Sequence, residues 1–171
     1  MHCIKTVQNI PISIEAAWEF FSNPANLQVI TPPKMGFRII STNHGDRMYA
    51  GQIIEYKVKP LFGIELYWMT EITHVDSRKY FIDEQRFGPY ALWHHQHHFK
   101  EIPGGVEMTD IVNYRMPLGF LGRAVNQVMV KDQLRSIFDF RSAKVEELFG
   151  KWGEEQHPVI KNQSQLIRVS G

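Results

Sequence analysis

The stretch GRAVNQVMVKDQLRSIFDFRSAKVEELF, residues 122–149, decides the fold of this chain. After Gly122 neither proline nor glycine interrupts it, and six apolar residues recur along it at the 3.6-residue helical period. They are Val130, Leu134, Ile137, Phe138, Val145 and Leu148. The pattern predicts one helix of about 27 residues, which would be about 40 Å long. A helix of this length needs a broad apolar surface to pack against, and the rest of the chain must supply that surface.

Charged side chains such as Asp132 and Arg135 lie within this helix and rule it out as a membrane span. Its first half carries further apolar residues on a different side of the helix, namely Leu121, Val125, Val128 and Met129. A long core helix accounts for the main stripe. The second apolar side also agrees with a helix whose first half covers a ligand chamber.

The composition indicates one ordinary globular domain. The chain has 171 residues, of which 43% are hydrophobic and 22% charged, and this length suffices for a substantial core. A formal charge of +1 gives no electrostatic reason to expect nucleic acid as a partner. Cys3 is the only cysteine, and no basic segment followed by an apolar run opens the chain, so we expect a cytoplasmic protein.

Before the long helix the sequence alternates strand patterns with turn residues. Two short helices are predicted after the first strand, with Ser13 and Asn23 as their N-terminal caps. The predicted strands are Ile4–Ile10, Phe37–Ser41, Gln52–Lys59, Ile64–Val75, Tyr80–Phe87, Tyr90–Ile102 and Val106–Met116. No helix alternates with these strands, which favours an antiparallel sheet in an α+β fold. Such a sheet, curved around the long helix, leaves a cavity unless large side chains fill it.

The segment Trp93–Phe99, WHHQHHF, is the most conspicuous one chemically. Side chains of a strand alternate between its two faces, so Trp93, His95, His97 and Phe99 share one face. The aromatic neighbours indicate that this face is the inner one. His94, Gln96 and His98 then face outward, where solvated surface residues are expected.

A two-residue turn at Gly104–Gly105 would place His97 opposite Val112 and His95 opposite Tyr114. The inner face of the last strand then carries Asp110 and Tyr114 beside the two histidines. Buried polar groups must find partners, so these residues must be hydrogen-bonded to one another, bind a ligand, or both.

Three interpretations of this cluster remain open. It can be a satisfied polar network that stiffens the hairpin, or it can anchor the polar head of a ligand. It can also be chemically active, as a His–Asp pair for acid–base catalysis or as a site with two histidines and one carboxylate for a metal. The sequence reveals neither a fourth metal ligand nor a carboxylate behind the histidines. We therefore expect no metal and no cofactor, and name no catalytic residue.

Other side chains are candidates for the wall of the same interior. Tyr56, Trp68 and Trp93 have the required aromatic character, and Met129 has the adaptability of a pocket residue. Gln85 is a further candidate, although its strand can be oriented so that Glu84 points inward instead. For Tyr56 and Trp68, packing in the core is the favoured explanation.

The order of elements resembles the START-like helix-grip fold, also called the SRPBCC superfamily. This superfamily includes lipid-transfer domains, plant pollen-allergen ligand carriers and polyketide cyclases/dehydrases. Locally, the chain resembles an uncharacterised bacterial ligand-binding subfamily over about residues 1–150. The matching positions are Gly88-Pro89-Tyr90, Trp93, His95, His97, Phe99, Thr109-Asp110, Tyr114 and Pro117-Leu118-Gly119.

This resemblance implies a sheet of about six or seven strands wrapped around the long helix, and a domain at residues 1–150 that binds a small hydrophobic ligand. Such a ligand would be a lipid, an isoprenoid or a polyketide-like molecule, held between sheet and helix. Residues 151–171 form a tail of unknown role. An enzyme of the cyclase/dehydratase kind and a protein-interaction module without a ligand are the alternatives, and catalysis is the less favoured.

The predicted ligand contacts are Tyr56, Trp68, Gln85, Trp93, His95, His97, Asp110, Tyr114 and Met129.

Overall fold

The computed structural model of the chain describes residues 1–41, 45–60, 63–117 and 120–153, and only the backbone of residues 120–128. Most of the predicted tail, from residue 154 onward, lies outside this description, as do the side chains of Leu121, Val125 and Val128. The division into a domain at 1–150 and a tail at 151–171 therefore stays a prediction.

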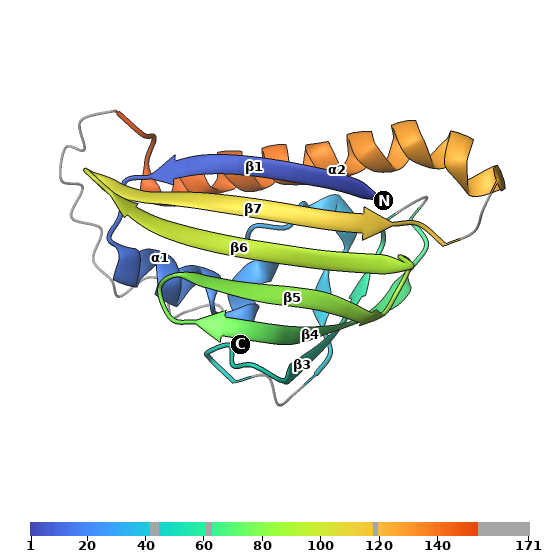
Figure 1. Ribbon diagram of the computed structural model, residues 1–171, viewed down its shortest axis with the longest axis horizontal. Helices are drawn as coiled ribbons and strands as arrows, with labels where there is room; N and C mark the ends of the chain where they lie inside the picture. Colours follow the sequence, from blue (N-terminus) through green and yellow to red (C-terminus); the bar gives the residue numbers. More distant parts are fainter. Residues whose placement is uncertain (42–44, 61–62, 118–119, 154–171) are drawn as a thin grey trace.

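The elements follow the predicted order of one strand, short helices, a series of strands and a long helix (Figure 1). They are β1 (His2–Ile10), α1 (Ile14–Phe21), η1 (Pro24–Gln28), η2 (Pro33–Met35), β2 (Arg38–Ile39), β3 (Gln52–Val58), β4 (Leu66–Asp76), β5 (Tyr80–Phe87), β6 (Leu92–Ile102), β7 (Gly105–Arg115) and α2 (Phe120–Phe149). The short elements η1 and η2 are 3-10 helices, so the second predicted helix is present in this tighter form.

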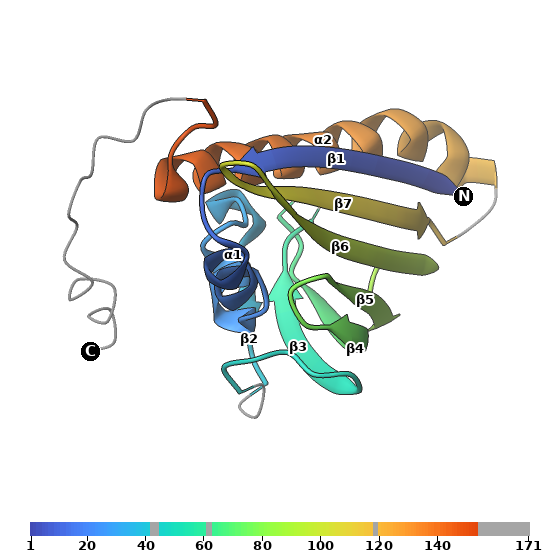
Figure 2. The same ribbon diagram turned by 60° about the vertical axis from the view of Figure 1, so that its left-hand side comes forward.

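All seven strands belong to one antiparallel sheet in the order β1-β7-β6-β5-β4-β3-β2. Consecutive strands from β2 to β7 are therefore neighbours, as expected of hairpins, and β1 pairs with the last strand. The sheet is curved, and α2 runs along the strands beside β1 and β7 (Figures 1 and 2). The α+β helix-grip architecture predicted from the sequence is confirmed.

The β6–β7 hairpin has a register that differs by two residues from the predicted one. His97 lies opposite Asp110 and His95 opposite Val112, because the turn consists of Pro103 and Gly104. Gly104 has a φ of 91°, the left-handed value that a tight turn after proline requires at this position. The prediction of a Gly104–Gly105 turn was therefore wrong. A shift by two residues keeps every side chain on its predicted face, however, so the inner histidines are buried as expected.

The helix α2 packs through the predicted apolar stripe, since Val130, Leu134, Phe138 and Val145 are buried. Arg141 belongs to the same stripe and is buried among them. Leu148, near the end of the helix, is 38% exposed and does not continue the buried stripe. In the part of the chain that the structure describes, no helix is long and apolar enough to cross a membrane.

The short helices cover one end of the curved sheet (Figure 2). The cap of α1 is Ser13, whose hydroxyl accepts a hydrogen bond from the backbone of Ala16, and Asn23 caps η1 in the same way through Ala25. Buried side chains of α1, including Phe21, pack against Phe81 and Phe99 of the sheet. Helix α2 and these short elements thus enclose the concave side of the sheet between them.

Candidate functional site

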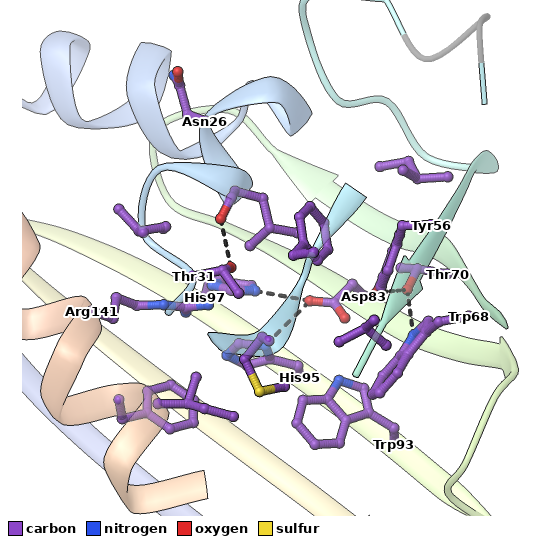
Figure 3. Close-up of a pocket in the computed structure, with 18 of the residues that line it drawn as sticks. Asn26, Thr31, Tyr56, Trp68, Thr70, Asp83, Trp93, His95, His97 and Arg141 are labelled. Atoms are coloured by element: carbon purple, nitrogen blue, oxygen red, sulfur yellow. Dashed lines mark hydrogen bonds and ion pairs between the residues drawn. The ribbon is translucent and has the colours of Figure 1, made fainter. Parts of the chain in front are cut away.

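A cavity of about 150 Å³ lies inside this enclosure. Its wall is built by β3 to β6, the two 3-10 helices, α1 and α2, so every layer of the fold contributes to it (Figure 3). The lining is largely apolar and includes Phe21, Ile30, Met35, Ile54, Tyr56, Val58, Trp68, Ile72, Phe81, Trp93, Leu134 and Phe138. The few polar side chains in the wall therefore determine which polar atoms the cavity can contact.

One part of the wall is a layer of aromatic rings. Tyr56 and Trp68, which lie opposite each other on β3 and β4, are stacked with ring centroids 5.8 Å apart. Trp93 meets Trp68 edge-on at 5.3 Å. Thr70 engages the polar atoms of the first two rings, because its hydroxyl lies 2.7 Å from Tyr56 Oη and accepts a hydrogen bond of 3.0 Å from Trp68 Nε1. This part of the wall consequently presents apolar ring surface to the cavity.

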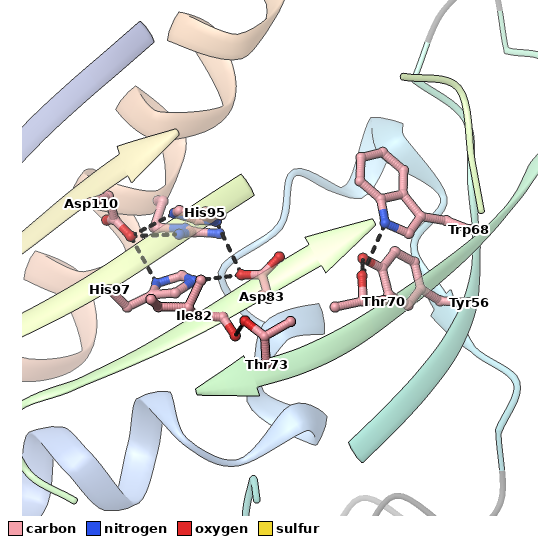
Figure 4. A network of polar contacts seen from close by, with 10 residues as sticks. Tyr56, Trp68, Thr70, Thr73, Ile82, Asp83, His95, His97 and Asp110 are labelled. Atoms are coloured by element: carbon pink, nitrogen blue, oxygen red, sulfur yellow. Dashed lines mark hydrogen bonds and ion pairs between the residues drawn. The ribbon is translucent and has the colours of Figure 1, made fainter. Parts of the chain in front are cut away.

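A different part of the wall carries a cluster of charged and titratable side chains (Figure 4). Asp83 comes from β5, His95 and His97 from β6, Asp110 from β7 and Arg141 from α2. The alternation of inward side chains on three adjacent strands places the two carboxyl groups on either side of the two imidazoles. Asp83, His95, His97 and Arg141 line the cavity, and Asp110 lies behind the histidines.

Each imidazole contacts both carboxylates, one through each ring nitrogen. His95 Nε2 is 2.9 Å from Asp110 Oδ1, and His95 Nδ1 is 3.4 Å from Asp83 Oδ2. His97 Nε2 is 2.9 Å from Asp83 Oδ2 in a hydrogen bond. His97 Nδ1 is also 2.9 Å from Asp110 Oδ1, but it is not aligned for a hydrogen bond.

These contacts shift the pKa values of all four groups. Burial alone would raise the pKa of Asp110, but the hydrogen bond from His95, the close contact with His97 and the charge of Arg141 lower it well below its usual range. The pKa of Asp83 is likewise lowered, because the neighbouring positive groups outweigh burial.

The pKa values of the two histidines shift in opposite directions. Burial lowers the pKa of His95, and the charge of His97 lowers it further. For His97, burial also acts to lower the pKa, but Asp110 and Asp83 outweigh it and raise the pKa. His97 is therefore the imidazole that is protonated more readily, because both carboxylates act on it.

Arg141 is held less completely than the other members of the cluster. Its Nη1 lies 3.6 Å from Asp110 Oδ1, and its guanidinium lies 5.1 Å from the ring centre of Phe138. Its Nε is buried and has no hydrogen-bond partner among the described residues. Arg141 is also among the residues that line the cavity.

Five of the nine predicted contact residues line the cavity: Tyr56, Trp68, Trp93, His95 and His97. The other four lie elsewhere. Asp110 stands behind the imidazoles, and Tyr114 is buried under Tyr90 with ring centroids 6.0 Å apart.

Gln85 and Met129 are outside the cavity for separate reasons. The amide of Gln85 accepts from the backbone N–H of Tyr90 and donates to its carbonyl, which holds the chain after the Gly88–Pro89 turn. Met129 is 42% exposed because it lies about 100° around the helix from the buried Val130.

The sequence interpretation missed Asp83 and Arg141. For Asp83 the available signal was parity with Phe81 on the same strand, which placed it inside with the aromatic residues. For Arg141 the signal was its position on the apolar stripe, three residues after Phe138 and four before Val145. Both signals were present in the sequence, but the residues were passed over because charged side chains are usually exposed.

The chain is similar to known proteins in structure, whereas comparisons of its sequence found no match. No protein-family model matches the chain, and no curated protein matches it in sequence. A START superfamily protein from Mycobacterium smegmatis is similar in structure, with a TM-score of 0.62 and 14% identity over 86% of this chain and 99% of that chain. The major latex-like protein 151 of Panax ginseng has a TM-score of 0.60 and 10% identity, over 86% of this chain and 97% of that one.

A third similar structure belongs to a larger protein. The nucleoside-diphosphate sugar epimerase of Corynebacterium glutamicum has a TM-score of 0.62 and 20% identity over 84% of this chain, but over only 28% of the epimerase chain. The likeness therefore concerns one part of that protein. At these identities each comparison bears on the fold alone. Together with the seven-stranded curved sheet and the long C-terminal helix, they show that this chain has the START-like, or SRPBCC, helix-grip fold.

Proposed function

We propose that this protein binds a small hydrophobic molecule with one polar end in the cavity between the sheet and α2. The observation that carries the proposal is the distribution of polarity around the cavity. Aromatic and aliphatic side chains form most of the wall, whereas Asp83, His95, His97 and Arg141 converge in one region of it. A few convergent polar groups in an otherwise apolar pocket are typical of a small-molecule site, where they fix the orientation of the ligand.

The unpartnered Nε of Arg141 suggests what the polar end of the ligand offers. A buried donor without an acceptor costs about 1–3 kcal/mol, and a ligand oxygen placed beside it would recover part of this cost. A hydroxyl, carbonyl or carboxylate oxygen fits this requirement. A purely hydrocarbon ligand would leave the Nε group unsatisfied and should bind less tightly.

The size of the cavity limits the size of the ligand. A cavity of about 150 Å³ compares with apolar cavities that bind benzene and is smaller than most ligand pockets, which measure about 300–1,000 Å³. Within the range of lipid, isoprenoid and polyketide-like ligands, this volume favours a molecule with one or two rings over a long acyl chain.

Native mass spectrometry of protein purified from cells, followed by solvent extraction, tests the proposal. We expect a bound mass that is extracted as one small apolar compound. Ile54 lines the cavity, whereas the adjacent Ile53 points outward from the same strand and is 42% exposed. Ile54→Phe should therefore lose the bound mass, and Ile53→Phe should keep it. If the Ile54→Phe and wild-type proteins carry the same compound, or if neither carries one, the proposal fails.

A further inference from the structure

Three side chains bring donor atoms together where the polar cluster meets the cavity. One carboxylate oxygen of Asp83 and one ring nitrogen each of His95 and His97 lie within 4.8 Å of one another. Asp83 Oδ2 is 2.9 Å from His97 Nε2 and 3.4 Å from His95 Nδ1. Donors at about 2.1 Å from one metal ion lie about 3.0 Å apart in octahedral and about 3.4 Å apart in tetrahedral geometry. The two separations between Asp83 and the histidines match those of ligands on a single ion, and all three donor atoms lie within 4.8 Å of one another.

The balance of donors and acceptors gives a second reason to place a cation here. Four ring nitrogens face ionised carboxylates, which can only accept hydrogen bonds. Two neutral imidazoles carry only two N–H groups between them. In two of the four contacts, a ring-nitrogen lone pair would therefore face a carboxylate oxygen, and both of these atoms can only accept a hydrogen bond. A positive species on the Asp83 side removes this conflict. A proton on His97 leaves the contact of His95 Nδ1 unsatisfied, whereas one metal ion engages Asp83, His95 and His97 together.

Asp110 supplies the support that a metal site of this kind needs. It contacts the ring nitrogens that point away from Asp83, namely His95 Nε2 and His97 Nδ1, each at 2.9 Å (Figure 4). If both of these nitrogens carry their protons toward Asp110, both lone pairs point toward Asp83. A carboxylate behind the imidazoles commonly fixes metal-binding histidines in this way.

The three side chains also line the cavity, so further coordination positions would be open toward it (Figure 3). Two imidazole nitrogens and one carboxylate oxygen suit borderline divalent ions such as Zn²⁺, Co²⁺ and Fe²⁺, whereas Mg²⁺ and Ca²⁺ prefer oxygen ligands alone. We propose that Asp83, His95 and His97 bind one divalent transition-metal ion at the polar end of the cavity, with Asp110 orienting the two histidines. This site does not require the proposed organic ligand.

Titration of the full chain, first stripped of metal with EDTA, tests the proposal with Zn²⁺ by calorimetry and with Co²⁺ by visible absorption. We expect one equivalent of Co²⁺ to bind with the absorption bands of a site containing nitrogen ligands, and Zn²⁺ to displace it. Asp83→Asn and His97→Gln should weaken binding by at least tenfold. Asp110→Asn should weaken it by about 10–100-fold, although Asp110 does not touch the ion.

His94→Gln is the matched control, because His94 lies on the outer face of the same strand and pairs with Glu84. It should bind both ions as the wild type does. The proposal is overturned if the wild type binds no stoichiometric ion, or if folded Asp83→Asn and His97→Gln bind as well as the His94→Gln control. Ile54→Phe separates this proposal from the preceding one, since it should lose the organic ligand while keeping the ion.

Discussion

Asp110 is the residue through which the polar cluster contributes to the stability of the fold. Its carboxylate is buried, lies within 2.9 Å of both inner histidines and 3.6 Å from Arg141, and touches the cavity only through them. Removing the charge would leave Arg141 without its counter-ion and the two histidines with Asp83 alone. The cost of such a change in a buried ion pair is large, whereas the pair as a whole adds little stability.

We predict that Asp110→Asn lowers the free energy of unfolding at pH 7 by about 3–5 kcal/mol in metal-free protein. Urea denaturation followed by circular dichroism measures this value. Asp76→Asn serves as the control, because Asp76 pairs with Lys79 at the surface, and it should change stability by less than about 0.5 kcal/mol. Equal effects of the two substitutions would contradict the assigned role of Asp110.

The same substitution should change how stability depends on pH. Because the pKa of Asp110 is lower in the folded state than in the unfolded chain, its carboxylate stabilises the protein above about pH 3.9. This contribution is lost as the pH falls through the folded-state pKa. The groups that face Asp110 are His95, His97 and Arg141. The stability difference between wild type and Asp110→Asn should therefore shrink below pH 4, and a difference that grows on acidification would refute this sign.

Thr70 has a structural role in the aromatic wall of the cavity. Its hydroxyl is the partner of both Tyr56 Oη and Trp68 Nε1. We predict that Thr70→Val, which keeps the side-chain shape, lowers the free energy of unfolding by about 1–3 kcal/mol because two buried polar atoms lose their partner. Thr73→Val is the control, since the partners of the Thr73 hydroxyl are the Ile82 carbonyl, in a long bond of 3.4 Å, and the exposed ring of His74 at 3.0 Å, which water can replace. Thermal and urea unfolding of both variants would detect the difference.

Among the secondary-structure elements, the pairing of β1 with β7 brings the first strand of the chain beside the last one. Gly105 begins β7, and a side chain there would place its Cβ 2.1 Å from the carbonyl oxygen of Ile10 and 2.9 Å from the ring of Trp152. The absence of a side chain thus allows the close approach of β1 to the β6–β7 turn.

Gly105→Ala should consequently destabilise the fold by about 1–3 kcal/mol through overpacking. Hydrogen exchange of the β1 and β7 amides should accelerate most, because the clash opens this edge of the sheet first. Glu107→Ala, two residues along the same strand, adds no atom near Ile10 and should have little effect. Unchanged exchange in Gly105→Ala would show that β1 can shift at no cost.

Most elements could be predicted from the sequence because their patterns are strong. The 3.6-residue period identified α2, and the alternation of Ile54, Tyr56 and Val58 identified β3. The β6–β7 register could not be predicted with the same certainty, because Pro103-Gly104-Gly105 permits two different two-residue turns. The turn that forms is the one with Gly104 in the left-handed conformation, and the sequence would equally allow Gly105 to occupy a turn position.

The site was predicted in part, for reasons that differ among its residues. The aromatic neighbours of His95 and His97 indicated a buried face, so these residues were found. Asp83 was missed because a charged side chain is expected at the surface, and parity with Phe81 alone is a weak signal on a strand that carries apolar and polar residues on both faces. Arg141 was missed because a charged side chain on a helix is usually exposed, although its position three residues after Phe138 and four before Val145 places it on the buried stripe.

At the scale of the whole molecule, the sheet, the short helices and α2 enclose a cavity with one polar region. Three core clusters surround this space without filling it, and the charged cluster lies where strands β5 to β7 approach α2. An interior of this kind suits a ligand with an apolar body and one polar atom. We therefore propose that the cavity distinguishes ligands by this polar atom as well as by size.

Comparison of p-cresol with p-xylene tests this claim most directly, because the two molecules have nearly the same shape and differ by a hydroxyl in place of a methyl group. Calorimetric titration of the wild type should give at least about tenfold tighter binding of p-cresol, since a hydrogen bond to a charged group contributes about 1.5–3 kcal/mol. Arg141→Met should remove this preference while p-xylene still binds. Tighter binding of p-xylene to the wild type, or no binding of either compound, would contradict the account.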